Sequence, residues 1–252
     1  MERLGIDEQR GKSIIRTWVG ANDFQIPYHD KPVVELVLKF VKALRPYGVV
    51  LNGDVVDCTG LSEFNKDPTD TPHLNQEMAD SAWLMATLAD CKITERWWLG
   101  GNHEDRLRRY LWTHAEKFAG VPAVQFPVLF DLDRYGFRWK PYGESLMLGK
   151  LMVTHGSQVL KHSGQSGKAH FDRYGTSVLI GHTHRLGIYY RRNVRGVHAG
   201  YENGCLCRLD PDWVQHPDWQ QGFSVVHVED NGLFSVQQIP VLNRKVLFYG
   251  DA

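Results

Sequence analysis

The sequence has little cysteine and no long apolar run. Its 252 residues include four cysteines, which do not show the spacing of a disulfide framework, so we expect a reducing, intracellular setting. Residues 1–13 are polar and lack the apolar stretch of a signal peptide, and no apolar run is long enough to span a bilayer. These absences predict a cytoplasmic protein that has no membrane partner.

Net charge is absent as well. The 29 basic and 29 acidic residues give a formal net charge of zero, so no global field draws the chain to nucleic acid or to an anionic membrane. A hydrophobic share of 42% is ordinary for a globular protein. Twelve histidines are more than usual for such a chain, and they favour metal chemistry slightly.

Short apolar runs end abruptly in Gly, Asn, Asp or His at five places. Continuous apolar runs of this length are typical of strands buried on both faces. The five runs are 14–23 (IIRTWVGAND), 49–54 (VVLNGD), 97–102 (WWLGGN), 151–155 (LMVTH) and 178–182 (VLIGH). Amphipathic patterns predict helices over 31–44, 74–90 and 103–118, the first with Asp30 as N-cap and Pro32 in its first turn.

The order of these segments predicts βαβ units with a largely parallel sheet. After about residue 144 the pattern changes to paired strands, with hairpins expected over 144–156, 187–200 and 224–240. No linker separates the halves. We therefore expect one α/β domain over 1–252, in which a second sheet packs on the first.

Polar residues suited to metal binding follow the apolar runs. Ligands in open α/β sheets bind just beyond the carboxyl ends of the strands. Asp, Asn and His side chains bind divalent ions such as Mn, Fe and Zn, and the number here is sufficient for two ions if one carboxylate bridges them. The candidates are Asp23, Gln25, Asp54, Asp57, Asn102, His103, His155, His182 and His184.

Each candidate alone has an ordinary explanation. Asp54 suits a turn after Gly53, Asn102 suits a helix N-cap, and a single His155 suits a hydrogen-bonded core position. Gly-His-Thr-His at 181–184 is harder to explain in this way, because alternate histidines can reach two adjacent ions. The joint occurrence in this order favours a metal centre.

Five motifs in register resemble the calcineurin-like metallophosphoesterase superfamily, whose usual pattern is D-x-H, G-D-x-x-D, G-N-H-[ED], a lone His and G-H-x-H. The resemblance spans residues 14 to about 200. The sequence around NHEDRLRRYLW and HAGYENGCL is also similar to that of stand-alone phosphoesterases of bacteria and their phages. The motifs here are D-x-Q (23–25), GDVVD (53–57), GNHE (101–104), THG (154–156) and GHTH (181–184).

The resemblance implies a four-layer α/β/β/α sandwich of two mixed sheets flanked by helices, with the metal site at the carboxyl ends of the strands. It implies two divalent ions, with Mn favoured over Fe, Zn and Mg, bridged by Asp54. Asp23, Gln25 and His184 would complete the first site, and Asn102, His155 and His182 the second. His103 would act as general acid, and Asp57 would hold it. Gly100 and Gly101 would let a phosphate approach the backbone.

The implied activity is hydrolysis of phosphate esters by a hydroxide held between the ions. Phosphodiesters are favoured, and a nuclease or a nucleotide phosphodiesterase is the main sub-hypothesis. A phosphomonoesterase remains the alternative. The partner is therefore a phosphate-ester substrate, with nucleotide or nucleic acid as candidates, and the sequence does not indicate an oligomeric state.

The chain departs from the patterns of the superfamily in two respects. Gln25 replaces the usual histidine with a neutral, weaker ligand, so the first site is expected to be weak, and a catalytically impaired metal- or phosphate-binding protein stays an alternative. His29 is a poor substitute for that ligand. Ser/Thr protein phosphatases of the superfamily carry arginines where this chain has Cys58 and Gly100, which disfavours a protein phosphatase.

Several segments are open candidates for substrate contacts. Residues 161–170 (KHSGQSGKAH) suit either a mobile phosphate-binding loop offering Lys161, His162 or Lys168, or a solvated loop. Arg106, Arg108 and Arg109 are expected mostly on a solvated helix face. The basic and aromatic stretch 189–195 suits an exposed face or a nucleic-acid contact. Trp213 and Trp219 suit the core edge or base stacking. For Cys205 and Cys207, a core role is favoured over metal binding.

Overall fold

The computed structural model describes residues 14–64, 73–211 and 214–248. Six strands form the first sheet, in the order β11-β10-β1-β2-β3-β4. Strands β1 to β4 run parallel, and β10 and β11 join antiparallel at one edge. The strands are β1 (Ile15–Ala21), β2 (Gly48–Asn52), β3 (Glu95–Leu99), β4 (Phe137–Lys140), β10 (Gly222–Glu229) and β11 (Phe234–Pro240).

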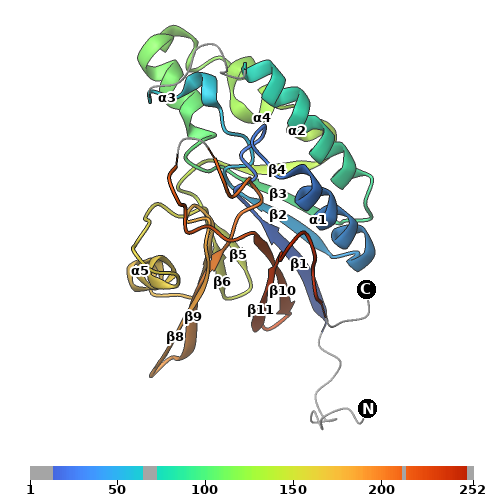
Figure 1. The fold of residues 1–252 in the computed structure, drawn as a ribbon, viewed down its shortest axis with the longest axis vertical. Coiled ribbons are helices and arrows are strands. Elements are labelled where there is room, and N and C mark those ends of the chain that lie inside the picture. The colour runs from blue at the N-terminus through green and yellow to red at the C-terminus, as the bar shows by residue number, and fades with distance from the viewer. Residues whose placement is uncertain (1–13, 65–72, 212–213, 249–252) are drawn as a thin grey trace.

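Helices cover the outer face of this sheet (Figure 1). They are α1 (Lys31–Leu44), α2 (Leu74–Ala89), α3 (Asp105–His114) and the short α4 (Phe126–Leu129), with 3-10 turns at Thr59–Leu61, Glu116–Phe118, Pro122–Val124 and Leu132–Tyr135. The Asp30 side chain accepts a hydrogen bond from the Val33 amide, which confirms the predicted cap of α1. Val33, Val37 and Val41 are buried and fix which face of α1 meets the sheet.

Five strands form the second sheet, in the order β5-β6-β7-β9-β8, with parallel and antiparallel pairs. They are β5 (Leu146–Leu148), β6 (Leu151–Val153), β7 (Val178–Ile180), β8 (Leu186–Asn193) and β9 (Gly196–Asn203). Helix α5 (Gln165–Tyr174) lies on the outer face of this sheet (Figure 1). Trp18, Val50 and Val226 of the first sheet pack against Leu151 and Leu179 of the second. The predicted four-layer α/β/β/α sandwich is therefore confirmed.

Two predicted elements differ from the structure. The helix expected over 103–118 begins at Asp105 and ends at His114, because Ala115 leaves helical geometry (φ −147°). Phe118 is consequently 59% exposed and does not share the buried face of Leu107. The loop expected over 161–170 is helical from Gln165 onward. The three predicted hairpins are present, the first turning at Gly149 with φ +60°.

Within the described part of the chain, no helix combines the length and the apolar character that crossing a bilayer requires.

A buried glutamate on α2 supports the loop after β2. The Glu77 carboxyl accepts hydrogen bonds from the backbone amides of Cys58 (2.5 Å) and Thr59 (3.0 Å). Burial raises the pKa of Glu77 to about 8, because desolvation outweighs these two hydrogen bonds. The folded protein therefore keeps a proton on Glu77 at pH values where the unfolded chain has lost it.

This difference predicts a pH dependence of stability. Between about pH 5 and 8 the folded state binds more protons than the unfolded state, so the Glu77 contribution to stability falls as the pH rises. The free energy of unfolding can be measured by urea denaturation from pH 5 to 8 with a chelator present. Its decrease over this pH range should be smaller in Glu77→Gln than in wild type, by up to about 3 kcal/mol. The exposed control Glu63→Gln should keep the wild-type slope. Identical slopes for Glu77→Gln and wild type would contradict this account.

Candidate metal centre

The predicted ligands lie in loops at the carboxyl ends of five strands, drawn from both sheets. The first sheet supplies residues after β1, β2 and β3, and the second sheet supplies residues after β6 and β7. Backbone hydrogen bonds from Asp23 N to Gly53 O (3.0 Å) and from Gln25 N to Asp54 O (2.9 Å) join the first two loops. Because the sheets pack face to face, their strand ends converge on one edge of the sandwich.

An unusual backbone conformation turns these loops sharply. Five of the seven predicted ligands have a left-handed backbone, which non-glycine residues rarely adopt. Such conformations persist only where the surrounding structure imposes them, and they gather at functional sites. They are Asp23 (φ 52°), Gln25 (φ 49°), Asp54 (φ 50°), His182 (φ 68°) and His184 (φ 57°).

Asp54, His155 and His182 form one tight group. One possible ligand atom from each lies within 4.8 Å of the other two. The His155 ring donates from Nδ1 to the Asn52 carbonyl (2.8 Å), so its Nε2 faces Asp54 Oδ2 at 3.1 Å. That arrangement fixes the histidine tautomer that binds a cation.

Asp23, Gln25 and His184 form a second group. Asp23 Oδ1 lies 3.2 Å from His184 Nε2, and the Gln25 amide nitrogen lies 3.2 Å from the same ring atom. The other Asp23 oxygen accepts a hydrogen bond from the His182 amide (2.9 Å), which links the two groups. His29 is elsewhere, with its ring against Trp83 at a centroid distance of 6.5 Å.

Several lone pairs in this region have no hydrogen-bond partner. Among the buried side-chain atoms of the described residues, those without a partner include Asp23 Oδ1, Asn102 Oδ1 and His155 Nε2. Leaving a buried polar atom unsatisfied is costly. All three belong to predicted ligands, and a divalent cation would satisfy them. The residues present therefore fit the metal ions that the motifs imply.

The charges in the centre are strongly coupled. Burial raises the pKa of Asp54, but His103 and His155 outweigh it and lower that pKa below its ordinary value. Burial also lowers the pKa of His155, yet the Asp54 carboxylate raises it to about 9, while burial lowers the pKa of His182 to about 4. Positive charge on the neighbouring histidines thus stabilises the buried Asp54 carboxylate, and a bound cation would stabilise it in the same way.

His103 is held beside Asp54 by a carboxylate and an arginine. Its Nδ1 lies 3.0 Å from Asp57 Oδ2, and its Nε2 lies 3.6 Å from Asp54 Oδ2. Arg106 donates to the Asp57 carbonyl (2.7 Å) and carboxylate (2.8 Å), and its Nη2 lies 3.3 Å from His103 Nε2. Burial lowers the pKa of His103, but Asp54 and Asp57 outweigh burial and raise it.

Arg106 is the exception among the three arginines that were expected mostly on a solvated helix face. Its side chain is only 17% exposed. Arg108 and Arg109, with side chains 46% and 50% exposed, fulfil that expectation and pair with Asp105. The sequence did contain a signal for Arg106, because residues three apart at the start of a helix share a face, and Arg106 follows His103 by three.

Glu104 has a structural role that the sequence did not reveal. Its buried carboxylate accepts hydrogen bonds from five N–H groups, which come from the loops after β2 and β3 and from one indole. The donors are Gly101 N (2.7 Å), Val55 N (2.8 Å), Asp54 N (2.9 Å), Trp98 Nε1 (3.2 Å) and Val56 N (3.3 Å). Glu104 therefore fixes Asp54 relative to Asn102 and His103.

Two glycines before Asn102 are required by close contacts. A Cβ on Gly100 would lie 2.8 Å from Trp139 Cη2, so an arginine does not fit there. A Cβ on Gly101 would overlap the Asp54 carboxylate and lie 2.5 Å from Asp54 N. Gly101 thus makes room for Asp54 rather than for a phosphate. Cys58, where protein phosphatases carry the other arginine, is fully buried.

The other substrate candidates are dispersed. Lys168 lies on α5 and pairs with Asp172 at 2.5 Å. The 189–195 stretch lies at the far end of the β8–β9 hairpin, because β8 runs eight residues away from the loop of His184, roughly 25 Å. Trp219 packs edge-on against His184 (ring centroids 4.3 Å) and so lies at the site, while Trp213 is outside the described residues.

Comparison with known proteins supports the fold. The sequence is 29% identical over 233 residues to the Gene 54 protein of Mycobacterium phage D29, covering 83% of this chain and 88% of that protein. It is 29% identical over 178 residues to the Gene 54 protein of Mycobacterium phage L5, covering 66% of this chain and 68% of that protein. No protein-family model matches the sequence.

Among solved structures, Vacuolar Protein Sorting 29 from Cryptosporidium parvum is similar over 92% of this chain and 95% of its own, at 14% identity and a TM-score of 0.51. The chain has the calcineurin-like metallophosphoesterase fold that its motifs implied. At this identity the likeness shows the fold and leaves the activity to be argued from the site.

The Glu104 hydrogen bonds generate a stability prediction. Glu104→Gln replaces one acceptor oxygen with an NH₂ group that faces backbone N–H donors, so the free energy of unfolding should fall by about 2–4 kcal/mol. Denaturant unfolding measures this loss. The matched control Glu116→Gln, an exposed glutamate, should stay within about 0.5 kcal/mol of wild type. Equal stabilities for the two variants would refute the role assigned to Glu104.

Proposed function

We propose that this protein is a metal-dependent phosphoesterase that binds two divalent cations. Asp23, Gln25 and His184 would hold the first ion, and Asn102, His155 and His182 the second. Asp54 lies at the second group and is tied through Gln25 to the loop of the first, so it is the candidate to contact both ions. The observation that carries the proposal is the gathering of these side chains with three buried, unpartnered lone-pair atoms among them.

The bound ions would supply Lewis-acid stabilisation of a phosphoryl group and lower the pKa of water at the site. The protein itself supplies proton transfer. His103 Nε2 faces Asp54, while Asp57 holds Nδ1 and favours the tautomer and the charged form of the ring. A protonated His103 can therefore give its Nε2 proton to the leaving oxygen of an ester.

Arg106 is the candidate to hold the phosphate. Its Nη1 is fixed by Asp57, and its Nη2 lies 3.3 Å from the same His103 atom that would donate the proton. An ester oxygen placed beside His103 Nε2 is thus within reach of the guanidinium. Charge-assisted hydrogen bonds from arginine to phosphate oxygens are strong and directional.

Among the described residues, few cationic side chains contact His103 and Asp57, and this favours phosphodiesters over monoesters. A monoester carries about two negative charges at neutral pH, and a diester carries one. Arginine is absent from the two positions where protein phosphatases have it, which leaves Arg106 as the guanidinium hydrogen-bonded to the catalytic pair of His103 and Asp57. The 189–195 stretch lies on the β8–β9 hairpin, which runs away from the metal centre, so it gives no support to polymeric nucleic acid over small diesters.

The first test is activity on an aryl phosphodiester with added manganese. Wild-type protein should hydrolyse it, and a chelator should remove the activity. Asp54→Asn should abolish turnover because the shared carboxylate is lost, and His103→Ala should lower kcat about 10²–10⁴-fold. The exposed control His114→Ala should match wild type. Wild-type rates from either site variant would overturn the proposal, and bound metal without turnover would indicate a binding protein instead.

The second test isolates Arg106. Arg106→Ala should lower kcat/KM for the diester about 10–100-fold, because a charge-assisted contact to the transferred phosphoryl group is lost. Arg106→Lys should recover part of the loss. Arg108→Ala, two positions further along the same helix with a half-exposed side chain, should stay within about twofold of wild type. A similar small loss for Arg106→Ala and Arg108→Ala would mean that Arg106 does not contact substrate.

A further inference from the structure

Two buried cysteines lie beside the candidate metal centre, and the proposed phosphoesterase chemistry does not use them. Cys205 and Cys207 are 0% and 1% exposed. They are buried, as expected for a core role, but they do not lie on a regular strand. They lie in the segment after β9, where Cys205 pairs with Gln221 and Cys207 pairs with His29 as isolated bridges.

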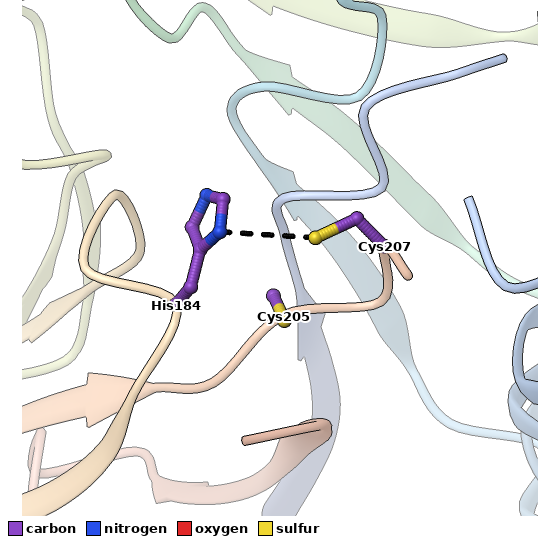
Figure 2. Close-up of side chains that lie close together, drawn as sticks. All are labelled: His184, Cys205 and Cys207. Atoms are coloured by element: carbon purple, nitrogen blue, oxygen red, sulfur yellow. Dashed lines mark hydrogen bonds between the residues drawn. The ribbon is translucent and has the colours of Figure 1, made fainter. Parts of the chain in front are cut away.

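The two thiols and His184 form a compact group. Figure 2 shows the Cys207 side chain pointing toward the His184 ring, and Cys207 Sγ lies 3.7 Å from His184 Nδ1. One ligand atom from each of His184, Cys205 and Cys207 lies within 4.8 Å of the other two. These residues come from two segments, the loop after β7 and the segment after β9.

The spacing suits a tetrahedral cation with sulfur and nitrogen ligands. Zinc binds thiolate sulfur at about 2.3 Å and imidazole nitrogen at about 2.0–2.1 Å, so tetrahedral angles place S and N roughly 3.6 Å apart. The observed 3.7 Å is close to that separation. A cation would therefore enter with little movement of His184 and Cys207.

We propose that His184, Cys205 and Cys207 form a further cation site, which is selective for soft or borderline ions such as Zn²⁺ and Cd²⁺ and shares His184 with the centre around Asp54. Thiolate and imidazole ligands suit these ions, whereas Mg²⁺ and Mn²⁺ prefer oxygen ligands. Binding replaces the thiol protons, which pass to solvent, so the step needs no oxidant or reductant. Two thiolates neutralise a dication, and Trp219 packs edge-on against the His184 ring.

His184 would belong to both sites but serve only one at a time. Its Nε2 faces Asp23 and Gln25, and its Nδ1 faces Cys207. A neutral imidazole has one lone pair, so a cation on Nδ1 leaves Nε2 protonated and unable to bind a metal. The first site would then keep Asp23, Asp54 and the weakly binding Gln25. As a consequence that rests on the proposed phosphoesterase function, soft ions would lower the manganese-dependent activity.

Cobalt(II) titration tests the site directly, because thiolate ligands give Co²⁺ an intense near-ultraviolet charge-transfer absorption that oxygen and nitrogen ligands do not give. Wild-type protein, kept reduced, should show this band, and Zn²⁺ should abolish it while Mg²⁺ leaves it unchanged. Asp54→Asn should keep the band, since it alters only the other centre. At saturating cobalt, Cys205→Ser and Cys207→Ser should each lower the band to about half or less, the double variant should lose it, and the control Cys91→Ser should keep it.

The wild-type titration keeps the proposal falsifiable even where a cysteine variant fails to fold. Cobalt bound without the thiolate band would overturn it, and so would a band of wild-type intensity in a folded variant that carries both Cys205→Ser and Cys207→Ser. The outcome is independent of phosphoesterase activity. A wild-type protein without turnover but with the band would contradict the proposed function and leave the thiolate site intact.

Discussion

The arrangement of the centre depends on the buried carboxylate of Glu104. It accepts hydrogen bonds from five N–H groups and so holds the loops that follow β2 and β3 in one relative position. Asp54 leaves β2 in a left-handed conformation, and its carboxylate accepts a hydrogen bond from the His103 amide (3.0 Å). Because Glu104 fixes these loops, their side chains have a defined position relative to the histidines of the second sheet. A strained backbone persists here because the surrounding hydrogen bonds determine it.

The same centre places charge where water is excluded. Asp23 and Asp54 are almost fully buried, and the nearest groups are histidines rather than lysines or arginines. Buried charges require compensation. Divalent cations would supply it and would also satisfy the unpartnered atoms of Asp23, Asn102 and His155. Because His184 faces this centre with one ring nitrogen and Cys207 with the other, the proposed thiolate site and the first proposed metal site would compete for one side chain.

The sequence predicted the sheets and the side chains that gather at the strand ends because both leave local signals. Buried parallel strands are continuous apolar runs, and Asp, Asn and His follow them at the positions where strand ends converge. Helix α5 was missed because Gly164 and Gly167 suggested a loop. Gly167 instead lets α5 approach β9, where a Cβ would lie 2.8 Å from the Gly200 carbonyl carbon. The contact of Cys207 with His184 joins separate segments, and no local pattern reveals it.

The claim that two cations surround Asp54 is most directly tested by anomalous diffraction from crystals grown with manganese and recorded at its absorption edge. The account predicts two peaks, both at coordination distance from Asp54, one beside His155 and His182 and a weaker one beside Asp23 and Gln25. A single peak, or peaks distant from Asp54, would contradict it.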